Sequence, residues 1–182
     1  VMVRKRDAAS TAPDAVVPDL PEQVLPAQLG LACPVIDPSS WDMELSGSRH
    51  LWGDYETGER IDHVDGMTVE EAEHMLATRL YQNTAKVHFN QFTEGQGRFG
   101  RRLIYGGHVI SLARALSFNG LANAFHVAAI NAGAHVAPLF ARETVFCWSE
   151  VLDTARLDGR DDVGALRLRT LATKDAPCSS FP

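Results

Sequence analysis

The most constraining feature of the sequence is one helix-like segment that is apolar around much of its circumference. Val109, Leu112, Ala113 and Leu116 follow one another at spacings of three and four residues, and Ile110 lies on a neighbouring stripe. This period is typical of an amphipathic α-helix, and so wide an apolar surface has to be covered by other elements. We therefore expect this helix to lie at the centre of the fold.

Three strand-like segments follow the helix after an Asn-Gly break at residues 119–120. They cover Phe125–His135, Ala141–Ser149 and Val163–Thr173, separated by Pro138 and by a polar turn over residues 158–162. Several consecutive strands after one apolar helix fit an α+β fold in which an antiparallel sheet wraps around a single helix.

The segment before the central helix predicts one more strand and one more helix. Residues 52–63 are typical of a turn and a strand, and residues 81–100 of a polar loop. Thr68 and Glu71 have the spacing of a capping box, so we expect a helix to start at Thr68. Its expected apolar face consists of Val69, Ala72, Met75, Leu76 and Leu80.

The rest of the chain suggests a domain organisation. Residues 1–7 alternate like a strand and resemble residues 166–176, since both end in a basic residue followed by Asp-Ala. We interpret 1–7 as the last strand of a preceding, missing repeat, although two short strands can also resemble each other by chance. Residues 8–48 are rich in proline and predict a linker. Residues 49–176 are then one domain, and 177–182 a C-terminal tail.

Composition excludes several kinds of partner. The formal charge of −6 disfavours nucleic acid, whose binding surfaces are usually basic, and no apolar run reaches the roughly 18 residues that a membrane span needs. Cys33, Cys147 and Cys178 lack metal-ligand spacing, so we expect free thiols, no metal site and a cytoplasmic protein.

Two segments carry residues suited to chemistry, namely 81–90 and 99–108. His88 is in the first, and histidine is the side chain that most readily accepts and donates protons near neutral pH, which suits proton transfer. Gly106 and Gly107 in the second start the central helix, where backbone N–H groups and the helix dipole favour a negative charge. We expect the other histidines of this half, His108, His126 and His135, to be structural or exposed.

These two segments resemble the hydratase motif of the MaoC-like dehydratase family. In that motif an Asp precedes a His by five residues, with an Asn-Pro pair between, and a Gly stands at the start of the central helix. Laid on this sequence, His88 matches the histidine and Gly107 the glycine. Asn83 takes the aspartate position, and Ala85 and Lys86 take the Asn-Pro pair. The resemblance covers residues 51–175.

The resemblance implies a hot-dog fold, with this chain as one complete repeat of a double hot-dog. It also implies a hydro-lyase that reversibly hydrates a short dicarboxylic enoyl-CoA of the mesaconyl-CoA or β-methylmalyl-CoA type. Coenzyme A would be part of the substrate, and no separate cofactor is expected. The expected partners are this acyl-CoA and a second hot-dog unit, either the missing N-terminal repeat or the mate in a homodimer.

Within this interpretation, His88, Asn83 and Gly107 are the candidate catalytic residues. Lys86 stands two positions before His88 and would face the same side if the segment were a strand, where it could bind the substrate carboxylate. Arginine offers better bidentate geometry for the same role. The full set of candidate substrate-binding residues is Lys86, Asn90, Arg98, Arg101, Arg102 and Gly106.

Asn83 departs from the motif because an amide cannot accept a proton as a carboxylate does. Three interpretations stay open: His88 works with Asn83 orienting water or the acyl chain, the decisive acid or base comes from the missing repeat, or this repeat is degenerate. The alternative functions are therefore a non-catalytic binding or dimerisation repeat, and a hydratase or thioesterase for another acyl-CoA.

Overall fold

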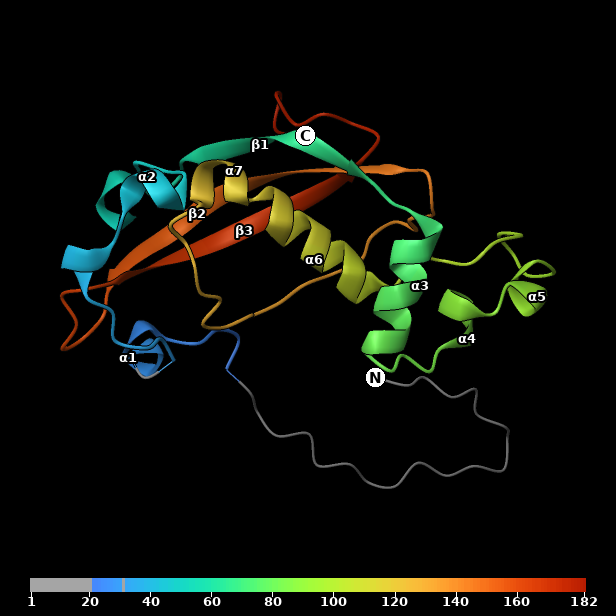
Figure 1. The fold of residues 1–182 in the computed structure, drawn as a ribbon, viewed down its shortest axis with the longest axis horizontal. Helices are drawn as coiled ribbons and strands as arrows, with labels where there is room; N and C mark the ends of the chain where they lie inside the picture. Colours follow the sequence, from blue (N-terminus) through green and yellow to red (C-terminus); the bar gives the residue numbers. More distant parts are fainter. Residues whose placement is uncertain (1–20, 31) are drawn as a thin grey trace, which may run out of the picture.

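A three-stranded antiparallel sheet forms the frame of the fold (Figure 1). The computed structural model describes residues 21–30 and 32–182, so the strand expected over 1–7 and the start of the expected linker lie outside the described residues. The sheet order is β1-β2-β3, with β1 at Arg60–Thr68, β2 at Thr144–Arg156 and β3 at Gly164–Lys174.

The helix α6 (Gly106–Leu116) runs along one face of this sheet, as Figure 1 shows. Its predicted apolar face is confirmed at Leu112, Ala113 and Leu116, which are buried, whereas Ile110 on the neighbouring stripe is 52% exposed, so the apolar surface is covered over a narrower width than predicted. The three buried residues form the core with Val69, Ile104, Leu139, Val145 and Cys147. An antiparallel sheet curved around one central helix is the hot-dog arrangement, as expected.

The turn between β2 and β3 holds the chain that precedes the domain. Arg160 donates hydrogen bonds to three carbonyl oxygens of that chain, and Asp162 accepts one from the backbone N–H of Ile36 at 3.0 Å. The carbonyls belong to Gly30, Cys33 and Pro34. The short helical turns here are α1 (Pro26–Leu29), η1 (Pro38–Ser40), α2 (Met43–Ser46) and η2 (Trp52–Asp54).

Strand β1 continues further than the sequence predicted. Thr68 still pairs with Thr144, and the two side-chain hydroxyls are 2.9 Å apart. Helix α3 therefore begins later, at Glu71–Leu80, with Glu70 as its N-cap, and the predicted helix start at Thr68 is wrong.

The buried face of α3 also differs from the prediction. Ala72, Leu76 and Leu80 are exposed, whereas His74, Ala77 and Thr78 are buried. Two polar side chains can occupy the inner face because each finds a backbone partner: Thr78 donates to the His74 carbonyl at 2.9 Å, and His74 bonds to two neighbouring segments. Apolar periodicity alone does not reveal such satisfied polar groups.

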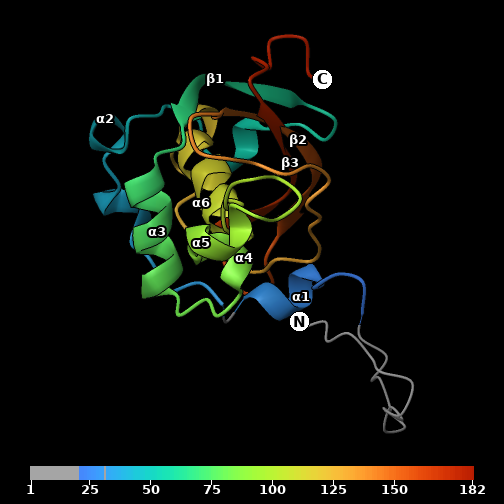
Figure 2. The same cartoon turned by 90° about the vertical axis from the view of Figure 1, so that its right-hand side faces the viewer.

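The predicted polar loop over residues 81–100 contains two short helices, α4 (Lys86–Phe89) and α5 (Gln91–Glu94). Both views place them beyond α3, near the start of α6 (Figure 2). The candidate residues of the first motif segment therefore lie at the end of α6 where its N–H groups are free of intrahelical bonds.

The strand expected at Phe125–His135 is wrong. After the short helix α7 (Phe118–Leu121) this segment forms no ladder with any described strand, and its side chains are exposed, with Ile130 at 73%. Alternation predicts a half-buried strand, but a strand also needs a neighbour for its backbone groups. The other two predicted strands of this half correspond to β2 and β3.

The three cysteines are free thiols, as expected. Burial raises the pKa of Cys147 to about 12, so that thiol stays protonated in the core. In the described residues no helix is long and apolar enough to cross a membrane. Within residues 21–30 and 32–182, no three side chains of His, Cys, Asp or Glu lie close enough together to hold a metal ion.

Candidate active site

The fold brings the two motif segments together beside the start of α6. The backbone N–H of Leu103 donates to the carbonyl of Val87 at 3.0 Å, and the His88 ring returns a bond to the carbonyl of Leu103 at 3.1 Å. The segments are thus cross-linked through neighbouring residues. The sequence placed both segments at one site, and the structure agrees.

The bond to the Leu103 carbonyl fixes the orientation of the His88 ring. A carbonyl oxygen only accepts, so His88 Nδ1 carries the hydrogen and Nε2 carries a lone pair in the neutral ring. Nε2 has no hydrogen-bond partner among the described residues, and the side chain is half-buried. The free nitrogen is therefore the basic one.

The start of α6 offers two backbone donors. The N–H groups of His108 and Val109 both bond to the Tyr105 carbonyl, at 2.9 and 3.3 Å. In the described part of the chain the N–H groups of Gly106 and Gly107, the first two residues of the helix, take no partner. Two adjacent donors at a helix N-terminus are suited to an oxygen that gains negative charge.

Two rings pack on these glycines. A Cβ on Gly107 would lie 2.7 Å from the phenol of Tyr105, and one on Gly106 would lie 2.5 Å from Nε2 of His135. The Tyr105 ring also meets the His88 ring edge-on, at 5.7 Å between centroids. Tyr105 thus contacts both the candidate base and the helix start, and any larger residue at either glycine would displace a ring.

Both candidate asparagines have their carbonyl oxygens in local turns. Asn83 accepts from the N–H of Ala85 at 2.8 Å, and Asn90 caps α5 by accepting from Thr93 at 3.1 Å. Asn83 therefore shapes the loop that leads into α4. Its amide oxygen is already bonded at the position where the family motif has a carboxylate.

Lys86 does not share a strand with His88. Both residues belong to the helical turn α4, where side chains two apart point about 200° away from each other. The prediction that they face the same side is therefore wrong, because the segment is helical. Lys86 itself is exposed.

The three candidate arginines differ in how much of their guanidinium group is free. Arg102 bonds to the Glu71 carboxylate and to the Phe89 carbonyl, so it is part of the framework. Arg101 lies over the Phe140 ring at 3.8 Å and pairs with Glu143 at 3.5 Å, yet remains exposed. Arg98 is exposed.

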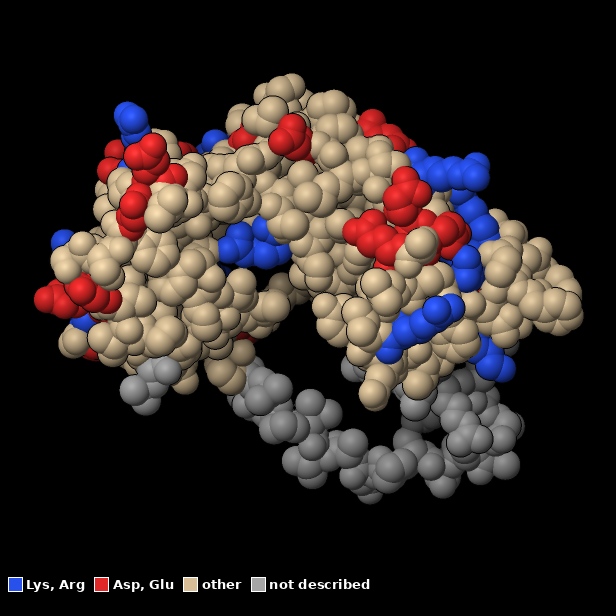
Figure 3. Space-filling model, in the orientation of Figure 1, with Lys and Arg blue, Asp and Glu red and all other residues tan. Residues whose placement is uncertain are grey.

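The surface around α3, α4 and α5 carries several basic side chains next to acidic ones (Figure 3). A separate cavity of about 190 Å³ lies near the other end of α6, lined by His50, Asp54, Tyr55, Glu59, Ile61 and Gly120. None of the candidate site residues lines that cavity.

Sequence reasoning missed two residues of this region, His74 and Tyr105. His135 was expected to be structural or exposed; it is exposed, and it also packs on Gly106. His74 escaped notice because it occupies the inner face of a helix judged only by its apolar residues. The spacing of His74 and Thr78, one helical turn apart, was the available signal.

No protein-family model matches the sequence. Two curated relatives do. The chain is 60% identical over 182 residues to a β-methylmalyl-CoA dehydratase of Chloroflexus aurantiacus, covering all of this chain and 51% of the relative. It is 59% identical over 178 residues to a mesaconyl-CoA hydratase of Cereibacter sphaeroides, covering 96% of this chain and 49% of the relative. The chain thus spans about half the length of these relatives.

Solved structures are also similar to this chain. A MaoC domain protein dehydratase from Chloroflexus aurantiacus superposes with a TM-score of 0.92 at 59% identity, over 99% of this chain and 51% of that one. A Mycobacterium tuberculosis protein described as a double hot-dog matches with a TM-score of 0.55 at 26% identity, over 82% of this chain and 43% of that one. The chain therefore has the fold of a hot-dog unit, and over almost its whole length it is similar to a MaoC domain protein dehydratase.

Proposed function

We propose that this chain contributes the active site of a hydro-lyase that reversibly hydrates mesaconyl-CoA to β-methylmalyl-CoA. The observation that carries the proposal is His88, whose Nδ1 is held by the Leu103 carbonyl and whose Nε2 is free beside Tyr105 and the start of α6. The names of the two curated relatives supply the substrate.

The arrangement supports a two-part mechanism. Nε2 of His88 removes a proton from water as the oxygen attacks the β-carbon of the unsaturated thioester. Negative charge collects on the thioester oxygen, where the N–H groups of Gly106 and Gly107 can donate to it. The protonated His88 then delivers its proton to the α-carbon. Asn83 is left with orienting water or the acyl chain, because its amide cannot exchange a proton.

The substrate anions call for cations. Mesaconyl-CoA has a free carboxylate, and its burial without a counter-charge or several donors would be very unfavourable. Lys86, Arg98 and Arg101 are exposed near the site and are the proposed candidates for this carboxylate and the CoA phosphates. Arg102 is unsuited, since its guanidinium group is already bonded to Glu71 and Phe89.

A second hot-dog unit is the proposed protein partner. The extended segment 125–136 lacks a ladder partner among the described strands and exposes Val127, Ile130 and Val136 at 53%, 73% and 95%. Exposed apolar side chains that form a contiguous patch often mark an interaction site, and we propose that these three contribute to one. The chain is similar to a protein described as a double hot-dog, and it spans about half the length of its curated relatives. Both findings support a second unit of the same kind. Either another repeat or a second copy can provide it.

We propose that the reaction needs no separate cofactor, because His88 and two backbone donors cover the proton transfers and the developing charge. We also propose a cytoplasmic location, in keeping with three free thiols.

Hydration assays with mesaconyl-CoA and with crotonyl-CoA test the proposal. An intact-mass measurement establishes which length of chain is being assayed. Turnover of mesaconyl-CoA is expected, with slower turnover of crotonyl-CoA because it lacks the second carboxylate. Binding of mesaconyl-CoA with no turnover would instead favour the alternative of a non-catalytic binding repeat. That alternative is supported by Asn83, which replaces the motif carboxylate and whose oxygen is occupied by Ala85.

A further inference from the structure

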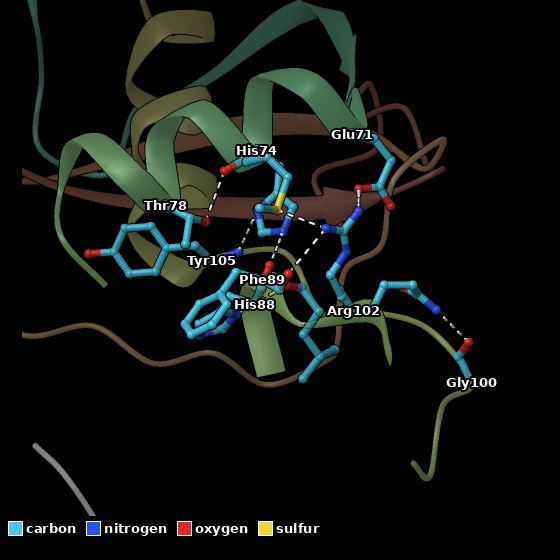
Figure 4. A network of polar contacts seen from close by, with 11 residues as sticks. Glu71, His74, Thr78, His88, Phe89, Gly100, Arg102 and Tyr105 are labelled. Atoms are coloured by element: carbon cyan, nitrogen blue, oxygen red, sulfur yellow. Dashed lines mark hydrogen bonds and ion pairs between the residues drawn. The ribbon is translucent and has the colours of Figure 1, made fainter. Parts of the chain in front are cut away.

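The buried imidazole of His74 connects the two halves of the candidate site. Its side chain has no exposed surface, and both ring nitrogens are bonded: Nε2 to the His88 carbonyl at 2.8 Å and Nδ1 to the Tyr105 N–H at 3.3 Å (Figure 4). The carbonyl only accepts and the N–H only donates. The ring is therefore neutral, with its hydrogen on Nε2.

The two partners of His74 belong to different parts of the site. His88 is the candidate base on α4, and Tyr105 is the N-cap of α6, directly before the free N–H groups of Gly106 and Gly107. A single side chain on α3 thus connects the backbone of the base with the backbone that begins the anion-binding turn. Displacing either contact would change the distance between base and helix start.

We propose that His74 is a positioning residue, which sets the place of His88 relative to the α6 N-terminus and so maintains the reactive tautomer of His88. This inference rests on the function proposed above. His74 reaches no substrate atom in this arrangement and acts only through the two backbone groups that it holds.

Neighbouring contacts on α3 support this role. Arg102 donates to the Phe89 carbonyl at 3.4 Å and pairs with Glu71, so α3 holds the same segment at a second point (Figure 4). Thr78 Oγ1 donates to the His74 carbonyl and adds to the hydrogen bonding within the helix. Neither contact reaches Tyr105, however. Among the described side chains, only His74 bonds to both Tyr105 and the His88 segment.

The charge state of His74 matters for the same reason. Burial lowers the pKa of His74, against the opposite effect of the hydrogen bond to His88 and of nearby Glu71, whereas Arg102 and His88 itself add to the lowering. A protonated ring would present an N–H at Nδ1 to the N–H of Tyr105. Two donors would then face each other, and that contact would open.

The test compares two variants of His74 with a matched variant of His63, measured in the intact protein. His63 is equally buried and also uses both ring nitrogens, but it bonds to the Asn119 carbonyl and the Ser149 hydroxyl, away from the site. His74→Leu removes both hydrogen bonds and keeps a side chain of similar size. His74→Gln retains one donor and one acceptor at the end of its side chain.

We expect His74→Leu to lower kcat by about 10- to 100-fold while KM changes less than about threefold. His74→Gln should recover a substantial part of kcat. His63→Leu should lose comparable thermal stability and keep kcat. The proposal is overturned if His74→Leu keeps the kcat of the wild type, if His63→Leu loses as much kcat as His74→Leu, or if His74→Gln is as impaired as a folded His74→Leu.

A spectroscopic readout keeps this test independent of catalysis. In the wild type, ¹⁵N NMR should show the neutral ring of His88 with its hydrogen on Nδ1, and in His74→Leu a mixture of both tautomers. If His74→Leu does not fold, His74→Gln is measured in its place. In His74→Gln the ring of His88 should retain its hydrogen on Nδ1. A wild type without hydration activity would reject the proposed function alone, whereas an unchanged His88 tautomer in every folded His74 variant would reject the role of His74.

Discussion

At the scale of single residues, His88 differs from the buried His63 and His74, whose two ring nitrogens are both bonded, in having one ring nitrogen bound and the other free. His88→Ala should reduce kcat for hydration by about 10²- to 10⁴-fold, because it removes the group proposed to carry the proton. The variant should still fold, since only the bond to the Leu103 carbonyl is lost. His126→Ala, at an exposed histidine outside the site, is the control, and circular dichroism checks folding. Near wild-type kcat in His88→Ala would remove His88 from the mechanism.

A substitution at Lys86 tests the proposed selectivity for a substrate with a second carboxylate. Lys86→Met should raise KM for mesaconyl-CoA by about 10-fold and affect crotonyl-CoA much less, because only the former has a second carboxylate. Arg49→Met, at an exposed arginine that is not among the candidate site residues, provides the comparison. Equal losses on both substrates would show that Lys86 does not bind the carboxylate and contacts the CoA portion or nothing.

At the scale of elements, the first two positions of α6, Gly106 and Gly107, have no room for a side chain. Gly107→Ala should lower kcat by about 10-fold or more, since the new Cβ would lie 2.7 Å from the Tyr105 phenol and displace the ring beside His88. Gly53→Ala is the matched control, because a Cβ there meets nothing within 4 Å. Steady-state kinetics on both variants decides the matter, and an unimpaired Gly107→Ala would mean that Tyr105 tolerates displacement.

The elements also show what the sequence could and could not predict. The central helix was predictable because its burial depends on its own apolar period, and Leu112 and Leu116 are buried as that period requires. The segment 125–135 was not, because a strand depends on a partner that its own residues do not specify. Likewise, the motif located His88 and Gly107, but the polar contacts of His74 depend on segments 14 and 31 residues further along the chain.

At the scale of the whole molecule, two buried histidines make stability depend on pH. Burial lowers the pKa of both His63 and His74 below the ordinary 6.5. The unfolded chain therefore binds these protons at a higher pH than the folded protein does, so acidification favours unfolding. The free energy of unfolding should fall as the pH drops below about 6.5 and stop falling, for these groups, below their folded-state pKa values.

Urea denaturation at a series of pH values measures this dependence. His63→Leu should flatten the curve between pH 7 and 5, although it lowers stability throughout, because one of the two titrating groups is gone. A slope as steep as that of the wild type would assign the pH dependence to other groups.

The proposed partner surface predicts a further property of the whole molecule. Replacing Ile130 and Val136 together by Asp should lower the thermal midpoint or halve the mass in solution, because charges would enter the proposed contact with a second hot-dog unit. Val35→Asp is the control, since Val35 is 83% exposed on the preceding chain. Light scattering and thermal melts measure both outcomes. An unaffected double variant would leave the segment without a partner.

The hydrogen bonds of Arg160 have a consequence for the order of events during synthesis. The guanidinium group binds carbonyls that precede it by 126 to 130 positions, so those carbonyls leave the ribosome well before the arginine exists. At typical elongation rates of about 5–20 residues per second, the interval is roughly 6 to 26 seconds. During that time residues 30–34 cannot form their bonds to Arg160. These bonds therefore form only after the turn between β2 and β3 has emerged.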